Sequence, residues 1–221
     1  GLVRRLPNQP DIAGVHVLRT LDDATALRDE LVEGARVVVI GAGFIGLEAA
    51  ATATKRGAKV TVLEGLDAPL IRALGSEMGA AIGAVHARNG VDIRCAVQVA
   101  SINGDTKVTS VTLTNGDIID ADVVIVGIGV APATQWCSES SLTIDDGIVC
   151  DANLNAGPAN VFVAGDVLRW PNGMFKDIEP TMRVEHWTNA AEQGAVAAQN
   201  LLATLRNEPM QPYSAVPFFW S

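Results

Sequence analysis

The sequence lacks the residue patterns of disulfide scaffolds, metal sites and nucleophilic hydrolases. Its three cysteines, Cys95, Cys137 and Cys150, are odd in number and form no CxxC pair, which favours free thiols in a reducing compartment. The three histidines form no HExxH-type cluster, so no zinc or iron site is expected. No Ser/His/Asp or Cys/His arrangement for nucleophilic catalysis can be identified, and no residue is assigned a catalytic role.

Basic residues and long apolar runs are also scarce. The 16 Lys and Arg against 25 Asp and Glu give a net charge of −9, which argues against nucleic acid as a partner. No apolar run approaches a membrane span and no signal peptide is visible, so no membrane partner and a cytoplasmic location are expected. The first residue is Gly1 rather than methionine, so the absence of a targeting segment is weak evidence for the location. With 221 residues, 48% of them hydrophobic, the chain can bury the core of one or two domains.

What the sequence does contain is a glycine-rich turn in its full context. Residues 36–64, RVVVIGAGFIGLEAAATATKRGAKVTVLE, predict a strand, a turn, a helix, a second strand and a terminal carboxylate. This is the order that a dinucleotide-binding βαβ unit requires. Gly41 allows the tight turn, Gly43 leaves room for a pyrophosphate, and Gly46 lets the helix pack close to the sheet. The alternative is a glycine turn in an ordinary α/β protein.

The start of this helix and Glu64 would bind the two ends of the adenosine diphosphate. The N–H groups of the first turn, at Phe44 and Ile45, and the helix dipole attract anions. Glu64 would accept hydrogen bonds from the ribose hydroxyls and repel a 2′-phosphate, which favours NAD(H) over NADP(H). Residues 65–67 offer no arginine for such a phosphate. A solvated loop carboxylate is the alternative for Glu64.

Residue periodicity predicts the other helices. Helical spacing and capping residues indicate helices at Leu21–Val32, at Glu77–Arg88 with Ser76 as N-cap, and at Asn189–Leu205 with Thr188 as N-cap. The residues before the first of these helices, interrupted by two prolines, predict an irregular connector.

The stretch over residues 91–126 changes to a β pattern. Asn103-Gly104 and Asn115-Gly116 are hairpin turn signals, which predict an antiparallel meander inserted between parallel strands. The stretch ends on the apolar run Val123–Val126, followed by a second glycine turn. We expect a parallel sheet with helices on both faces.

The C-terminal part predicts smaller elements. A hairpin is expected around Asp146-Gly147, and a short strand at Asn160–Ala164 that Gly165-Asp166 closes. The ending PYSAVPFFWS is apolar with no room to bury itself, so it is expected to be truncated.

This order of motifs resembles the FAD-dependent pyridine-nucleotide oxidoreductases, in particular the NADH-dependent ferredoxin and rubredoxin reductases. Four stretches carry the resemblance: GAGFIGLEAA with Glu64, VVIVGIGVAP, NVFVAGDV, and RVEHWTNAAEQGAVAAQNLL. With PYSAVPFFWS it covers nearly the whole chain. It implies an α/β fold, with a Rossmann-like NAD-binding domain that has a parallel sheet and an antiparallel meander, plus a partial FAD-binding domain.

The resemblance also implies a domain order. Residues 1–19 resemble the exit of a first FAD segment or a linker, 20–132 the NAD-binding domain, 133–213 a second FAD segment, and 214–221 the start of a truncated C-terminal interface domain. The glycine loop of the first FAD segment has no counterpart in these 221 residues. The chain by itself is therefore expected to hold FAD weakly and to be inactive.

Resemblance assigns further residues to the two cofactors. On the NAD side, Glu48 matches a carboxylate near the nicotinamide, and Arg72 matches a position near the adenosine phosphate. The second glycine turn contains Gly127 and Gly129, and Gly129 matches a residue that approaches the nicotinamide end. From the residues alone, Glu48 is equally an exposed helix glutamate and Arg72 a surface arginine.

On the FAD side, Gly165-Asp166 matches the contact to ribitol and phosphate, and Trp187 matches the position against the isoalloxazine ring. A turn-initiating aspartate and a core tryptophan are the alternatives.

The implied activity is that of an NADH-dependent flavoprotein reductase, with FAD and NAD as cofactors. It would pass electrons from NADH through FAD to a small iron–sulfur protein such as a ferredoxin of an oxygenase system, or to rubredoxin. Alternatives are a rubredoxin, monodehydroascorbate, nitrite or disulfide reductase of the same family, or an NAD(H)-binding module without activity.

Overall fold

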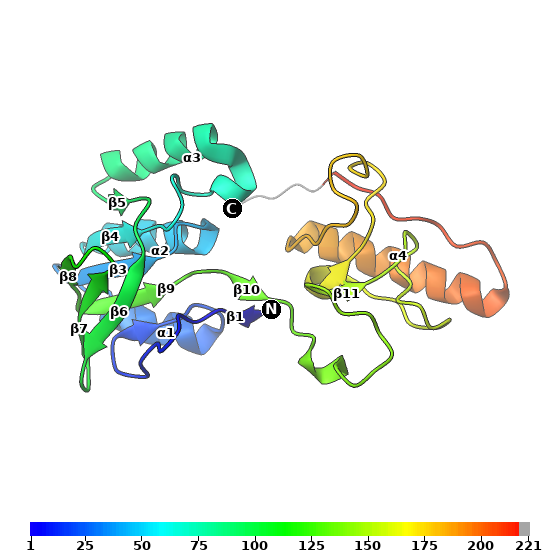
Figure 1. Cartoon of the computed structure of the whole chain (residues 1–221), viewed down its shortest axis with the longest axis horizontal. Coiled ribbons are helices and arrows are strands. Elements are labelled where there is room, and N and C mark those ends of the chain that lie inside the picture. Colours follow the sequence, from blue (N-terminus) through cyan, green and yellow to red (C-terminus); the bar gives the residue numbers. More distant parts are fainter. Residues whose placement is uncertain (217–221) are drawn as a thin grey trace. The chain divides into compact units, whose positions relative to one another are not determined.

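Runs rich in valine and isoleucine form a five-stranded parallel sheet in the computed structural model, which describes residues 1–216 (Figure 1). Continuous apolar runs of this kind suit strands that are covered on both faces. In spatial order the strands are β2 (Val15–His16), β9 (Val123–Val126), β3 (Arg36–Ile40), β4 (Lys59–Leu63) and β5 (Asp92–Arg94). This confirms the predicted parallel sheet.

The chain divides into two compact units. The larger comprises residues 3–129 and contains the parallel sheet; the smaller comprises Gly1 and Leu2 together with the residues from Val130 onward. Strand β1 (Leu2–Val3) pairs with β10 (Val130–Ala131). The predicted irregular connector is wrong in two places, because β1 and β2 both lie before the first helix.

The two faces of the parallel sheet pack against different structures. Val37 and Val39 of β3 face one core cluster, which residues of all three helices of the larger unit complete. Val38 and Ile40 face a second cluster, formed with strands of an antiparallel sheet. The helices are α1 (Leu21–Glu30), α2 (Phe44–Lys55) and α3 (Ile71–Arg88). The expectation of helices on both faces is therefore wrong.

The second face is covered by the three-stranded antiparallel sheet instead. It consists of β6 (Val99–Gly104), β7 (Val108–Leu113) and β8 (Ile118–Asp120), paired in that order (Figure 1). Alternating apolar residues of β7, Val111 and Leu113, are buried against the parallel sheet. This confirms the meander and explains why no helix is needed on this face.

One hairpin turn of the meander differs from the prediction. The Asn115-Gly116 turn is present, with the Gly116 N–H donating to the Leu113 carbonyl at 3.0 Å. Asn103 and Gly104 belong to β6, and Gly104 pairs with Val108 after a register shift. The chain therefore reverses over residues 105–107, after the end of β6, instead of at Asn103-Gly104.

The helix ends follow from capping chemistry. Thr20 and Asp23 form a capping box at the start of α1, each side chain accepting from the other's backbone N–H. Helix α3 begins at Ile71 rather than Glu77, and its axis is broken at Gly75, which has a φ of 76°. The predicted helix therefore matches only the part after this break.

The smaller unit is built around one long helix, α4 (Trp187–Arg206). Its N-cap is His186 rather than the predicted Thr188, and it ends at the left-handed Asn207. Short elements precede it: η1 (Gln135–Cys137), β11 (Ile148–Val149), η2 (Gly165–Val167) and β12 (Leu168–Arg169). Ile144 and Ile148 form an antiparallel bridge around the predicted Asp146-Gly147 turn.

Two predictions for the smaller unit are wrong. Residues 160–164 form no strand, because their pairing is limited to a bridge between Asn155 and Phe162. The ending is also not wholly unburied. Tyr213 is 6% exposed and packs on Trp170, with ring centroids 5.7 Å apart. Phe218, Phe219 and Trp220, to which the prediction of an apolar, truncated ending also applied, lie outside the described residues.

Candidate functional site

The turn between β3 and α2 admits only glycine at two positions. Gly41 has a φ of 101°, and a Cβ added there would lie 2.5 Å from the Gly127 carbonyl oxygen. A Cβ added to Gly46 would lie 2.0 Å from the Gly41 carbonyl oxygen. Real atoms do not approach this closely, so these glycines allow helix α2, the turn and the loop after β9 to pack together.

Gly43 is different, because a Cβ added there would meet nothing within 4 Å. It is the N-cap of α2 with an ordinary φ of −76°, and no side chain caps this helix end among the residues described. Phe44 packs against the core, whereas Ile45 is exposed. An open approach to an uncapped helix N-terminus suits a phosphate group.

Glu64 is held directly beside this turn. One carboxylate oxygen accepts the Ala42 N–H at 2.7 Å, and the other accepts the Leu66 N–H at 2.9 Å. Its own backbone is fixed by hydrogen bonds with Arg94 and Val97. The carboxylate is thus bound to the glycine-rich turn rather than being a solvated loop side chain.

Other predicted residues gather at the same edge of the sheet. The Gly127 N–H donates to the Ile40 carbonyl at 2.8 Å, and Gly129, with a φ of 96°, is exposed two residues further. The Leu70 N–H donates to the Ala42 carbonyl at 3.0 Å, which places the start of α3, with exposed Arg72, close to the turn. Glu48 is exposed on α2.

This edge is where the carboxyl ends of β3, β4 and β9 meet. In open parallel sheets, ligands bind outside the carboxyl ends of the strands. The geometry therefore fits a dinucleotide whose pyrophosphate lies on α2 and whose ribose reaches Glu64.

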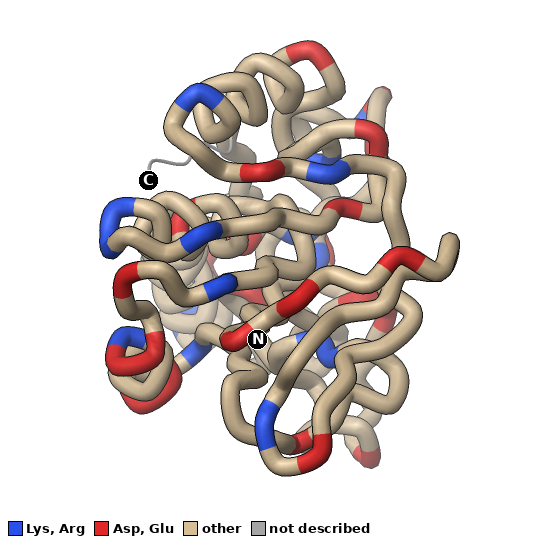
Figure 2. The backbone as a smooth tube through the Cα atoms, turned by 90° about the vertical axis from the view of Figure 1, so that its left-hand side faces the viewer, with Lys and Arg blue, Asp and Glu red and all other residues tan. Residues whose placement is uncertain are grey.

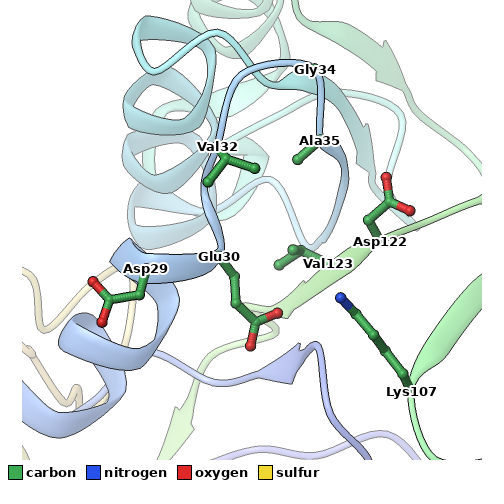
Figure 3. Close-up of a pocket in the computed structure, with 8 residues that line it drawn as sticks. All are labelled: Asp29, Glu30, Val32, Gly34, Ala35, Lys107, Asp122 and Val123. Atoms are coloured by element: carbon green, nitrogen blue, oxygen red, sulfur yellow. The ribbon is translucent and has the colours of Figure 1, made fainter.

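A separate pocket lies at the opposite edge of the sheet. Its volume is about 450 Å³, and Ala35, just before β3, and Val123, the first residue of β9, line it. Glu30 and Lys107 reach toward Val123 from α1 and from the turn before β7 (Figure 3). Because it lies at the amino ends of the strands, this pocket is not part of the dinucleotide site.

The residues predicted to contact flavin all belong to the smaller unit. Gly165, with a φ of 76°, and Asp166 open the turn η2, and both are half-buried. Trp187 is the first residue of α4 and is 84% exposed. Among residues 1–216 it is therefore not packed in a core.

Two side chains that received no individual role in the sequence hold the Gly165-Asp166 turn. Gln193 accepts the Gly165 N–H at 2.9 Å, and Arg183 donates to the Asp166 carbonyl at 3.2 Å. A helical wheel of α4 gives a signal for Gln193, because it lies on one stripe with the buried Asn189, Ala197 and Asn200. No sequence signal identifies the Arg183 contact.

Two of the three thiols lie where their surroundings disfavour the thiolate. Burial raises the pKa of the Cys150 thiol to about 12, and burial together with Glu64 and Asp67 raises that of Cys95. A raised pKa disfavours the nucleophilic thiolate. In residues 1–216, no group of three or more His, Cys, Asp or Glu side chains is placed to hold a metal ion.

Acidic and basic residues are interspersed along the backbone when the larger unit faces the viewer (Figure 2). None of the helices in the described part of the chain has both the length and the apolar character that a membrane span requires.

The fold and the glycine-rich turn define a Rossmann-like α/β protein. The profile of the family described as pyridine nucleotide-disulphide oxidoreductase matches residues 4–194. The chain belongs to this family.

Relatives with known names agree with this assignment. Rhodocoxin reductase of Rhodococcus erythropolis is 39% identical over 212 residues, which cover 96% of this chain and 48% of that protein. The ferredoxin–NAD(+) reductase component of the anthranilate 1,2-dioxygenase system of Burkholderia cepacia is 38% identical over 214 residues, 96% of this chain and 51% of that protein. The chain thus spans about half the length of these relatives.

A solved structure matches over the same extent. The ferredoxin reductase for the CYP199A2 system of Rhodopseudomonas palustris superposes with a TM-score of 0.88 at 32% identity, covering 98% of this chain and 52% of that one. The similarity therefore includes both units of the chain.

Proposed function

We propose that the chain is the central part of an NADH-dependent flavoprotein reductase that supplies electrons to a small iron–sulfur protein, such as a ferredoxin of an oxygenase system. The match over 96% of the chain to proteins named rhodocoxin reductase and ferredoxin–NAD(+) reductase component of a dioxygenase system carries the proposal. The glycine-rich turn with Glu64 supports it, because it provides the geometry for the electron donor. The free cysteines are compatible with the cytoplasmic location that we propose.

The larger unit binds NADH in this proposal. The pyrophosphate lies at the N-terminus of α2, with Gly41, Gly43, Phe44, Ile45 and Gly46 forming the turn that receives it. Glu64 accepts hydrogen bonds from the ribose and disfavours a 2′-phosphate.

The remaining residues of the larger unit bind the ends of the nucleotide. Glu48, Gly127 and Gly129 lie toward the nicotinamide, and Arg72 lies toward the adenosine phosphate. Support comes from their position around the same edge of the parallel sheet.

The smaller unit contributes to a flavin site. Asp166 accepts a hydrogen bond from a ribityl hydroxyl, Gly165 allows the backbone to turn beneath it, and Trp187 lies against the ring system. FAD, when bound, supplies the redox chemistry, taking hydride from NADH and releasing electrons one at a time. These side chains align the cofactor, and none of them acts as nucleophile or base.

The test uses the polypeptide encoded by the complete reading frame. Purified protein is expected to be yellow, to reduce ferricyanide with NADH, and to reduce a ferredoxin at a rate that NADPH does not match. A colourless protein that binds NADH and reduces nothing would contradict the proposal and identify a nucleotide-binding module. Turnover with a disulfide substrate in place of ferredoxin would assign the chain to another reductase of the family.

A further inference from the structure

The backbone of the Gly165-Asp166 turn is held by a buried amide side chain. Gln193 lies on α4 and is 0% exposed, and its Oε1 accepts the Gly165 N–H at 2.9 Å. Gly165 is the residue at which the chain takes its left-handed conformation, with a φ of 76°. The hydrogen bond from Gly165 to Gln193 therefore holds the backbone at the residue where the chain turns, directly before Asp166.

The other side of the turn is held by Arg183. Its Nη1 donates to the Asp166 carbonyl at 3.2 Å, and its side chain is only 12% exposed. Arg183 is oriented in turn by an ion pair with Asp146 at 3.4 Å and by one with Glu185. The N–H of Gly165 and the carbonyl of Asp166 are thus both bound by side chains from outside the turn.

Stability alone does not explain why the side chain at position 193 is an amide. Its Nε2 has no hydrogen-bond partner among residues 1–216. The orientation of the amide is fixed, because the Gly165 N–H is a donor and must face the oxygen. Burying an unpaired donor costs at least as much as one neutral hydrogen bond contributes, so the bond to Gly165 does not by itself account for an amide at this position.

We propose that Gln193 is a positioning residue of the flavin site, which acts through the Gly165-Asp166 turn to fix the Asp166 carboxylate. This inference rests on the proposed function, because it assumes that Asp166 binds the flavin. Arg183 supports the same turn from its other side. Neither side chain is required to touch the cofactor.

Three variants of the full-length polypeptide separate positioning from stability. Gln193→Met has a side chain of similar length without an amide, and Gln193→Glu keeps an acceptor oxygen whether or not it is ionised. Gln199→Met is the matched control, because Gln199 is exposed on the same helix. The measurements are the FAD dissociation constant, the thermal midpoint of the flavin-free protein, and hydrogen exchange of the Gly165 amide.

Gln193→Met is expected to weaken FAD binding about tenfold, since it removes one hydrogen bond that orients the site. Its Gly165 amide should exchange faster, while the thermal midpoint changes little, because loss of the bond to the half-buried Gly165 N–H is offset by removal of the unpaired Nε2. Gln193→Glu should restore protection of the Gly165 amide, and Gln199→Met should match the wild type in all three measurements.

The outcomes distinguish the two proposals. Equal FAD affinity in wild type and Gln193→Met, or a loss of affinity that only accompanies a lower thermal midpoint, would overturn the positioning role. A wild-type protein that binds no FAD would overturn the proposed function, and this inference with it.

Discussion

Gly43 and Gly46 are three residues apart, yet they meet different surroundings. A Cβ at Gly46 would clash with the Gly41 carbonyl oxygen at 2.0 Å, whereas a Cβ at Gly43 would enter open space. We expect Gly46→Ala to lower the free energy of unfolding by about 1–3 kcal/mol or more, because a packed backbone must move. Gly43→Ala should leave stability nearly unchanged and still weaken NADH binding. Denaturant unfolding and NADH titration would check this pair of variants. If Gly43→Ala bound NADH as tightly as the wild type, the proposed position of the pyrophosphate at Gly43 would be wrong.

Glu64 has two functions at the residue scale, one toward the nucleotide and one toward the glycine-rich turn. Glu64→Ala is expected to weaken NADH binding by about 1.5–3 kcal/mol and to narrow the preference over NADPH, because charged hydrogen bonds are lost. Glu64→Gln should lose less, since it keeps one acceptor oxygen for a backbone amide.

Asp67→Ala is the matched control for Glu64→Ala, because Asp67 is an exposed carboxylate three residues away. Fluorescence titration with both nucleotides measures the effect. Equal affinities for NADH and NADPH in the wild type would eliminate Glu64 as the selecting residue.

At the scale of elements, β3 and β9 are joined at their amino ends by Arg36 and Asp122. The Arg36 guanidinium and backbone N–H both donate to Asp122, at distances of 2.7–3.0 Å, and lower the pKa of this carboxyl to about 2. Since the folded-state pKa lies below the ordinary value of 3.8, the ionised form stabilises the fold above about pH 4. This contribution is lost as the pH falls from 3.8 toward 2.

We therefore expect Asp122→Asn to lower the free energy of unfolding by about 0.5–1 kcal/mol at pH 7, a modest effect because the side chain is partly exposed. The difference from wild type should disappear near pH 2. Asp120→Asn is the control, since Asp120 is 70% exposed and binds Arg36 by one hydrogen bond. Urea unfolding at several pH values checks this, and a constant difference down to pH 2 would contradict it.

At the scale of the whole molecule, each compact unit has its own hydrophobic core. Two clusters fill the larger unit, and a third, which includes Trp170 and Tyr213, fills the smaller one. We expect calorimetry of the 221-residue chain to show two transitions. NADH should shift only the transition of the larger unit to higher temperature. At a concentration of 100 Kd, NADH should increase the free energy of unfolding of this unit by about 2.7 kcal/mol.

Gly43→Ala tests this assignment, because it should reduce the NADH shift without moving the other transition. A single transition, or two that NADH shifts equally, would show that the units unfold together.

How much the sequence predicts depends on how local the cause is. The strand, turn and helix of residues 36–64 follow from hydrophobic periodicity and glycine spacing, and the parallel sheet and meander follow from runs of β-branched residues. The start of α3 at Ile71 could not be predicted, because the Leu70 N–H bonds to Ala42, far away in the sequence. The meander itself was predicted, but its packing on the second face of the parallel sheet, in place of helices, could not be, because it depends on contacts such as those of Val111 and Leu113 with Val38 and Ile40.

The sequence by itself determined the glycine-rich turn, the carboxylate that follows it and the family, because each depends on residue types at short and fixed spacing. Only the tertiary structure decided that Glu64 binds the Ala42 amide and that Gln193 and Arg183 hold the Gly165-Asp166 turn. These contacts join residues 17 to 28 positions apart, and such pairs meet only when helices and turns have packed. A side-chain hydrogen bond leaves no periodic trace in a sequence, so its partner is defined by the folded chain.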